Sequence, residues 1–510
     1  MISFLISLAA LILGYFIYGR LVERIFHADN RPTPAVVHPD GVDYVPLPTW
    51  RIFTIQFLNI AGTGPIFGAI MGMLFGPAAY LWIVLGCIFA GAVHDYLTGM
   101  LSLRHDGAGL PSIIGHYLGK PAMRVMLVFS MILLLMVGAV FVYSPAEIMG
   151  GMTGGKMWWV AAIFAYYVVA TLLPIDKVIG KVYPLFAIAL LFMAVALLVG
   201  LLIKQPAMPE LWDMGNMEQI TSKLSVEGHD MGFTNFLRNN PLFPCLFITI
   251  ACGAISGFHA TQSPLMARCM RSERLGRPIF YGAMITEGLV ALIWASISSY
   301  FFYCDGWKEV VSPEVLNDYL AHADKQSFID YFNAPRVVKY VCTGWLGIFG
   351  GILAILGVVA APITTGDTAF RSARLIIADF LKLEQRTIKN RLVISIPMFA
   401  GAFALLWWQM ANPSGFKVLW QYFGWSNQTL SVFSLWAVTV YLVRKRKFFW
   451  VTLLPAIFMT TICSVFLLVS PDALHLNPAI TPWASAAVAI LATAAFAVWY
   501  RHERASTHEL

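Results

Sequence analysis

The residues with the clearest chemical potential are polar groups that interrupt two otherwise apolar stretches. In the stretch 51–76 a Gly-Thr-Gly-Pro run follows Asn59, and in 241–268 a Ser-Gly-Phe-His run follows an apolar start. Glycine and proline interrupt helices, and a backbone opened within a membrane is tolerated only where protein or a water-filled cavity satisfies it. We therefore predict a binding site at the breaks, with a kinked helix or small-residue packing as the alternative. Amides at Asn427 and Gln428 either face the same cavity or bond another helix. The candidate residues of the two breaks are Asn59, Gly62, Thr63, Gly64, Pro65, Ser256, Gly257 and His259.

A further polar group lies in the stretch 337–370. Thr364 and Thr365 offer hydroxyl oxygens, which are hard ligands that suit a hard cation. Asp367 precedes Arg371 by about one turn of helix, so these two side chains can pair. Two roles therefore stay open for Asp367, namely carrying a coupling proton or forming a structural ion pair at the inner face.

A histidine and an aspartate are adjacent near the end of another apolar stretch. An ionisable residue inside a membrane segment is a functional candidate by default, and histidine titrates near neutral pH, so His94 and Asp95 can carry protons. Neighbouring residues on a helix do not face each other, so the two need not be partners. The alternative is that Asp95 pairs with Arg104 or His105 at the inner surface. No metal site is predicted, because zinc requires three or four convergent ligands and neither His94 nor His259 has a ligand at a chelating spacing.

These groups belong to a chain with the composition of a polytopic membrane protein. Of its 510 residues 59% are hydrophobic and only 12% are charged, which is about half the charged share of a soluble protein. Apolar runs of about 20 residues, the length that crosses a bilayer, recur along the chain. The net charge of +7 is explained by loop topology and does not indicate nucleic acid. We predict an all-α fold with thirteen transmembrane segments at 2–22, 51–76, 77–101, 122–144, 157–173, 183–203, 241–268, 278–302, 337–370, 391–410, 416–443, 448–470 and 480–500.

The charged loops orient these segments. Most Lys and Arg residues follow odd-numbered segments, and cytoplasmic loops carry such an excess, so we place the N-terminus outside and the C-terminus in the cytoplasm. Residues 2–22 are long enough to span the bilayer, so we interpret them as a first transmembrane helix rather than a cleaved signal peptide. The seven cysteines form no CxxC pair and are interpreted as small buried apolar residues.

The two interrupted stretches are the second and the seventh segment. Because five is an odd number, consecutive five-helix units have opposite orientations in the membrane. We therefore predict a LeuT-like inverted repeat of residues 51–203 and 241–443, in which each unit opens with a discontinuous helix. The remaining regions are a first helix with a Pro-rich inner segment at 1–50, an outer loop at 204–240, an acidic outer loop at 303–336 within the second repeat, and two C-terminal helices with a tail at 444–510.

Six sequence motifs occur in order along the predicted core. They are DGVDYVP at Asp40–Pro46, IAGTGPIFG at Ile60–Gly68, FAGAVHDY at Phe89–Tyr96, LFPCLFITIACGAISGFHA at Leu242–Ala260, GDTAFRSARLIIADF at Gly366–Phe380 and FGWSNQTL at Phe423–Leu430. These motifs resemble the family of carbon starvation protein A, CstA. The resemblance implies the fold of the amino acid–polyamine–organocation superfamily, and import of peptides or pyruvate across the bacterial inner membrane in response to carbon starvation. Known members are longer and carry Gln where this chain has His94, and their sequence differs after the SGFHA motif.

We predict a secondary active transporter of small carboxylate nutrients, either short peptides or pyruvate, that is coupled to protons. The predicted partners are this small-molecule substrate and the lipid bilayer, with no nucleic acid. No cofactor is expected beyond a coupling cation, H⁺ or Na⁺, and no GxxxxGK[ST] run indicates direct ATP coupling. Two alternatives stay open: a membrane-embedded enzyme, for which we find no convergent catalytic set, and a sensor or channel without gradient coupling.

Overall fold

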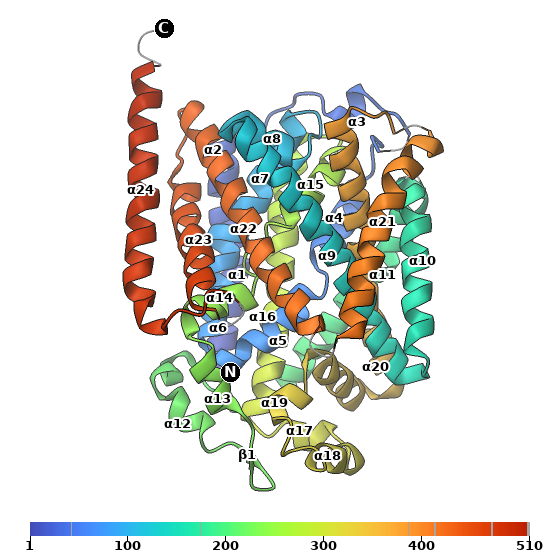
Figure 1. Ribbon diagram of the computed structural model, residues 1–510, viewed down its shortest axis with the longest axis vertical. Coiled ribbons are helices and arrows are strands. Elements are labelled where there is room, and N and C mark those ends of the chain that lie inside the picture. The colour runs from blue at the N-terminus through green and yellow to red at the C-terminus, as the bar shows by residue number, and fades with distance from the viewer. Residues whose placement is uncertain (42, 174, 386, 413–414, 471–472, 507–510) are drawn as a thin grey trace.

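The computed structural model describes residues 1–506 except 42, 174, 386, 413–414 and 471–472. Helices make up most of the described chain and run along a common direction in one bundle (Figure 1). Two short strands, β1 (Ser225–Val226) and β2 (His229–Asp230), pair antiparallel in a hairpin beyond one end of the bundle. The predicted all-α membrane architecture is therefore confirmed, as lipid requires of a chain whose backbone groups must be satisfied within each segment.

The first half of the bundle follows the predicted order of segments. Two π-helical turns, Gly64–Gly68 and Cys87–Gly91, precede α5 and α7. The helices of this half are α1 (Ile2–Phe16), α2 (Tyr18–Phe26), α3 (Pro34–Val37), α4 (Thr49–Ile60), α5 (Ala69–Gly72), α6 (Ala78–Gly86), α7 (Ala92–Arg104), α8 (Leu110–Leu118), α9 (Lys120–Thr153), α10 (Lys156–Leu172) and α11 (Ile175–Lys204).

The second half contains the second predicted discontinuous helix, which follows the short helices α12 and α13. Its longest element, α20, packs against α9 and α11 of the first half and is kinked at Gly347, which has a φ of +66°. The helices of this half are α12 (Met217–Thr221), α13 (Phe233–Asn239), α14 (Leu242–Thr249), α15 (His259–Ala267), α16 (Gly282–Tyr303), α17 (Trp307–Val310), α18 (Pro313–Leu320), α19 (Phe328–Tyr331), α20 (Ala334–Leu381), α21 (Ile388–Ala411), α22 (Gly415–Arg444), α23 (Trp450–Val469) and α24 (Thr481–Ser506).

The number of membrane spans agrees with the prediction only in part. Within the described residues, 9 helices are long and apolar enough to cross a membrane, or 10 when the bent pair at the first break is one span. The other predicted segments correspond to the short apolar helix α10, the broken pair α14–α15 and α22. The count of thirteen therefore stays a prediction.

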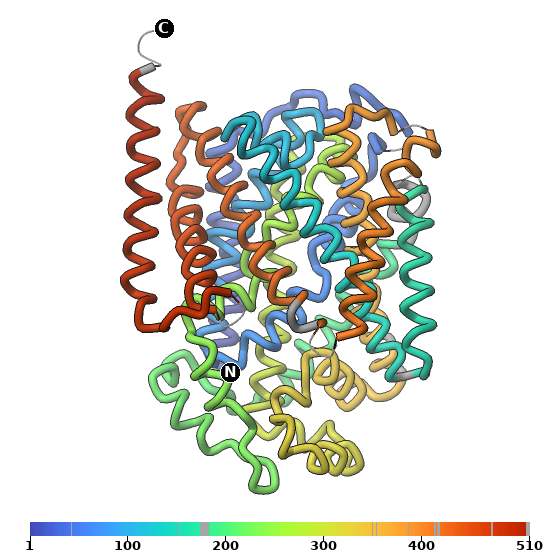
Figure 2. Tube along the Cα trace, viewed as in Figure 1, coloured from blue at the N-terminus to red at the C-terminus, as the bar shows by residue number. Residues whose placement is uncertain are grey.

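The loops and the chain termini are divided between the two ends of the bundle as the loop charges predict. The N-terminus lies at the same end as α12, α13 and α17–α19, and the C-terminus lies at the opposite end with α2, α3 and α8 (Figures 1 and 2). The amino group of Met1 forms an ion pair with Glu210, which precedes α12. The grouping of the loops into two sides is thus as predicted, and the assignment of one side to the cytoplasm stays a prediction.

Candidate functional site

Both predicted helix breaks are present. α4 ends at Ile60 and the chain becomes helical again at Gly64, with an angle of 53° between the two halves. The second break separates α14 from α15, and its residue Gly253 has a φ of +94°, the left-handed region that favours glycine. In both places the sequence supplies residues that a continuous helix would disfavour, so the breaks are encoded locally.

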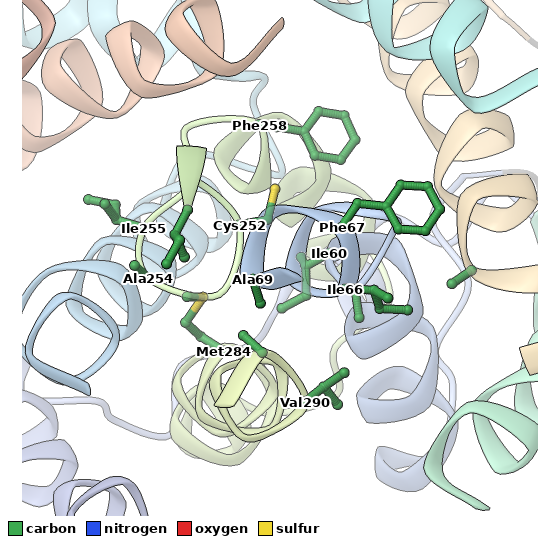
Figure 3. Close-up of a cluster of buried hydrophobic side chains, with 14 of the residues drawn as sticks. Ile60, Ile66, Phe67, Ala69, Cys252, Ala254, Ile255, Phe258, Met284 and Val290 are labelled. Atoms are coloured by element: carbon green, nitrogen blue, oxygen red, sulfur yellow. The ribbon is translucent and has the colours of Figure 1, made fainter. Parts of the chain in front are cut away.

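The two breaks lie against each other, as the inverted repeat predicts. A Cβ atom added at Gly64 would lie 2.3 Å from Cβ of Cys252, and one added at Gly68 would lie 2.9 Å from the carbonyl oxygen of Thr249. Figure 3 shows Cys252 beside the broken helix that carries Phe67. The contact falls at Cys252–Gly253, slightly earlier in the chain than the Ser256–His259 stretch that we expected. The glycines of the first break are therefore required because backbone meets side chain there without space for a larger residue.

The second break is stabilised by Asn427 of α22. Its side-chain oxygen accepts hydrogen bonds from Ser256 Oγ at 3.0 Å and from the backbone N–H of Phe258 at 2.6 Å, and its carbonyl oxygen accepts one from the N–H of Gly257 at 3.2 Å. The neighbouring Gln428 donates to the carbonyl oxygen of Phe247 at 3.0 Å. Both amides therefore bond to the second broken helix. In this state the backbone N–H groups of Gly257 and Phe258 are therefore bonded to Asn427 and are not free to bind a ligand.

The centre of the site is a fully buried row of acids and imidazoles. The carboxylate of Asp95 lies between two rings, with Oδ1 2.8 Å from Nδ1 of His94 and Oδ2 2.7 Å from Nδ1 of His259. His94 Nε2 lies 2.6 Å from Ser434 Oγ, and His259 Nε2 lies 3.5 Å from Glu287 Oε2. The row joins α7, α15, α16 and α22, and it connects α7 to the start of the half-helix after the second break.

This geometry shows which groups Asp95 contacts. His94 and Asp95 are partners, because their side chains bend toward one another although they are adjacent in sequence. Asp95 has no exposed surface and does not pair with Arg104, which instead donates to Glu273 at 2.5 Å. The structural alternative of an ion pair at the inner surface is therefore wrong.

Glu287 is the member of the row that sequence reasoning missed. It is an acid in the middle of an apolar helix, so the rule that singled out Asp95 applies to it equally. Both of its carboxylate oxygens and Nε2 of His259 are buried and have no hydrogen-bond partner in the described part of the chain. Ligand atoms of Cys252, His259 and Glu287 lie within 4.8 Å of one another and could hold a metal ion, a convergence that the sequence spacing did not reveal.

The predicted cation ligands lie beside the first break. Thr365 Oγ1 donates to the carbonyl oxygen of Leu58 at 3.0 Å, and Thr364 Oγ1 donates to that of Ala361 at 2.8 Å. Asp367 Oδ2 accepts a hydrogen bond from Tyr183 of α11 at 2.7 Å, and no ion pair to Arg371 is present between these described residues. α20 therefore contacts the end of α4 beside the first break, while cation binding there stays a prediction.

The first break also presents polar groups with unused bonding capacity. Asn59 and Thr63 are fully buried, and the amide atoms of Asn59 and the hydroxyl of Thr63 have no hydrogen-bond partner among the residues described. Buried polar groups are normally satisfied, so each such group asks for a ligand or an ordered water. Asp95, His259 and Glu287 of the buried row likewise have no exposed surface.

Comparison with known proteins decides the family. A sequence model described as Carbon starvation protein CstA matches residues 1–220 and 142–466. The chain belongs to the CstA family. The resemblance of the six motifs is thereby confirmed over most of the chain, and the LeuT-like fold is the architecture of this member.

Similar proteins are found in bacteria, and two of those compared are named transporters. The chain is 46% identical to an uncharacterized membrane protein of Haemophilus influenzae, over 59% of this chain and 91% of the relative. It is 26% identical to the peptide transporter CstA of Escherichia coli, over 90% of this chain and 79% of the relative. It is 25% identical to the pyruvate/proton symporter BtsT of Escherichia coli, over 91% of this chain and 80% of the relative. The family thus includes transporters with different named substrates.

A solved structure shares the fold. The manganese transporter of Eremococcus coleocola superposes with a TM-score of 0.54 at 12% identity, and the match covers 91% of this chain and 98% of that one. At this identity the likeness concerns the arrangement of helices alone. It supports the LeuT-like core of two five-helix repeats.

Proposed function

We propose that this chain is a secondary active transporter that imports small carboxylate nutrients, pyruvate or short peptides, across the bacterial inner membrane by symport with protons. The observation that carries the proposal is the gap between His259 Nε2 and Glu287, 3.5 Å wide and fully buried. The named relatives, a peptide transporter and a pyruvate/proton symporter, support the substrate class.

The gap between His259 Nε2 and Glu287 is suited to a proton because both groups that border it are hydrogen-bond acceptors. When Nδ1 of His259 donates to Asp95, Nε2 of the neutral ring is an acceptor. Glu287 as a carboxylate is also an acceptor, so two acceptors face each other without a hydrogen between them. One added proton turns this contact into a charge-assisted hydrogen bond and reduces the buried charge, which is otherwise costly.

The same proton can influence the substrate site through the backbone. His259 directly follows Phe258, whose N–H is held by Asn427, and it begins the half-helix after the second break. A change in the bond between His259 and Glu287 therefore acts on the segment that packs against Gly64 and Pro65. A substrate carboxylate would be bound at the first break by Asn59, Thr63 and backbone N–H groups near the start of the half-helix that follows it. The N-terminal end of a helix favours anions.

Uptake into proteoliposomes tests the proposal. Labelled pyruvate and labelled dialanine should accumulate above their outside concentration when the outside is acidic, and should only equilibrate without a gradient. A sodium gradient at equal pH is the matched comparison, because it tests whether Na⁺ bound at Thr364 and Thr365 drives uptake instead of a proton. Accumulation driven by sodium alone, chemical conversion of the substrate, or downhill flux unaffected by the proton gradient would each contradict symport with protons.

A chelator distinguishes a proton from a metal at the gap. If Cys252, His259 and Glu287 hold a transition metal during transport, EDTA should abolish uptake and zinc or manganese should restore it. We expect uptake in the presence of EDTA to be unchanged. Glu314→Gln, in the outer loop, serves as the control variant with full uptake because this glutamate is exposed on α18.

A further inference from the structure

A second cluster of buried charge lies toward the end of the bundle that holds the C-terminus. Arg371 and Arg374 of α20 have no exposed surface. Both approach one carboxylate oxygen, Oδ1 of Asp43, at 3.9 Å from Arg371 Nη1 and 3.7 Å from Arg374 Nη2. Asp43 belongs to the Pro-rich segment at 28–48, so a segment outside the helical core supplies the only carboxylate that the described structure places within 4 Å of this pair.

The two guanidinium groups are poorly satisfied by this arrangement. Arg371 donates to the carbonyl oxygen of Ala170 at 2.8 Å, and Arg374 donates to Gln385 at 2.7 Å. In the described part of the chain, Nε and Nη1 of Arg371, Nε and Nη2 of Arg374, and Oδ1 of Asp43 have no hydrogen-bond partner. A guanidinium–carboxylate pair normally closes to about 2.7–2.9 Å, often with two parallel bonds. The pair therefore has capacity for a carboxylate that fits it better than Asp43 does.

The cluster lies between the central site and the membrane surface. Arg371 follows Thr365, which contacts the first break, by six residues of α20, or about 9 Å along the helix axis. Ser372 Oγ donates to the carbonyl oxygen of Thr261 at 3.0 Å, so α15 runs beside this part of α20. A solute that leaves the site between these two helices would pass the arginines.

The segment that carries Asp43 is hydrogen-bonded to the chain just after α15. Thr33 Oγ1 donates to the carbonyl oxygen of Met270 at 2.6 Å, and the N–H of Leu47 donates to that of Cys269 at 3.1 Å. Cys269 is fully buried beneath it. The segment therefore covers the end of α15 without being part of the helical bundle.

We propose that Arg371 and Arg374 form a carboxylate-binding site on the exit path, which Asp43 occupies while the path is closed. An outgoing substrate carboxylate takes the place of Asp43, and the segment at 28–48 then withdraws. The carboxylate chemistry of the ligand rests on the proposed function. The geometry supports it, because the carboxylate of Asp43, the one within 4 Å of these two buried cations in the described chain, is placed too far away for a closed ion pair.

Equilibrium binding of labelled acetate to the purified protein, without a proton gradient, tests the site. Asp43→Asn removes the competing carboxylate and should tighten acetate binding about tenfold, which corresponds to 1.4 kcal/mol. Adding Arg371→Gln to Asp43→Asn should return the affinity to that of the unmodified protein or below. Asp43→Glu keeps the charge with a longer reach, so it should weaken acetate binding. Asp29→Asn is the control, because Asp29 lies in the same segment in an exposed pair with Arg31.

Labelling of Cys269 by a membrane-impermeant maleimide in inside-out vesicles, read by mass spectrometry, reports the segment itself. Asp43→Asn should increase the labelling rate and Asp29→Asn should not. Unchanged acetate affinity in both Asp43 variants would overturn the proposal, as would faster labelling without a change in affinity. Loss of proton-driven uptake together with normal acetate effects would defeat the proposed function and leave this site in place.

Discussion

Nδ1 of His259 lies 2.7 Å from Oδ2 of Asp95, and neither side chain has exposed surface, although 164 residues separate them. The bond ties the half-helix after the second break to α7, a helix of the first repeat. Because Asp95 also contacts His94, one carboxylate holds two imidazoles in place. The protonation of this row and the position of the broken helix are therefore linked.

Asp95→Asn should separate proton coupling from substrate binding. The amide has no negative charge and only one acceptor oxygen, so it cannot accept a hydrogen bond from both rings or balance the charge of a protonated one. We expect gradient-driven accumulation in proteoliposomes to fall at least about tenfold, which corresponds to 1.4 kcal/mol, while exchange of labelled for unlabelled substrate continues. Asp106→Asn, at an exposed position, is the control. Accumulation equal to that of the unmodified protein would remove Asp95 from the coupling mechanism.

Asp367→Asn should reveal a structural role. Tyr183 donates to this carboxylate, and an amide oxygen can accept the same bond. We expect a melting temperature a few degrees lower, because a buried charge near Arg371 is lost, and unchanged accumulation for each folded molecule. Size-exclusion yield, melting temperature and uptake are measured together. Lost accumulation at a normal melting temperature would instead assign the coupling proton to Asp367.

Gly64→Ala should drive the two breaks apart. The added Cβ would lie 2.3 Å from Cβ and 2.4 Å from Sγ of Cys252, so one helix must move. We expect substrate binding to be lost. Cys252→Gly deletes both obstructing atoms, so the double variant should recover binding at least partly. Gly151→Ala, where nothing lies within 4 Å, is the matched control. Failure of the double variant to bind better than Gly64→Ala alone would mean that the close contact is not the cause.

The orientation in the membrane can be checked with reporter fusions. A reporter in the loop of Arg444–Lys447 should score as cytoplasmic, and one in the loop 303–336 as periplasmic, because the first is basic and the second acidic. Both loops lie at the ends of the bundle that this pattern requires (Figure 1). The reverse pattern would invert the direction of transport that we propose.

Lys447 gives a pH dependence of stability. It lies in the loop after α22, where burial and then the neighbouring Arg104 lower its pKa to about 8. Between pH 8 and the unfolded value of about 10.4 the unfolded chain binds more protons, so stability rises with pH across this window. Lys447→Met should remove that rise, and Lys445→Met at an exposed position should not. Since Lys447 is only partly buried, the effect on the free energy of unfolding should be below about 1 kcal/mol. Melting curves at pH 7.5 and 10 in detergent measure it.

The fold could be predicted from the sequence because its signals are local. Gly62–Pro65 and the ITIACGAISGFHA run disfavour a continuous helix wherever they are placed, and their separation by five segments follows from counting apolar runs. Predicting the helices of the bundle required no knowledge of tertiary contacts. Both α9 and α20 extend beyond their predicted ends. In α20 the additional turns carry Arg371 and Arg374, which are polar but are buried against other protein and not against lipid.

The site was only partly predictable because its contacts join distant segments. No spacing rule relates Glu287 to His259, or Asp43 to Arg371, and the side chains of these pairs meet only after the bundle forms. Asp95 was recognised as a candidate, but its partner could not be, since both Arg104 and His259 satisfy the same electrostatic requirement. The sequence singled out Asn427, and its bonds to the backbone of the second break follow only from geometry, while its contact with substrate stays a prediction.

Asn427 also bears on how the molecule moves. Three bonds to the second break start from this one residue, two at its side-chain oxygen and one at its carbonyl oxygen. When α22 moves as a rigid helix, all three bonds lengthen together. Intermediate positions would leave two buried backbone N–H groups and the hydroxyl of Ser256 unpaired at once, at a cost of several kcal/mol. Opening at this point should therefore be abrupt, with two discrete positions of α22 and few molecules between them.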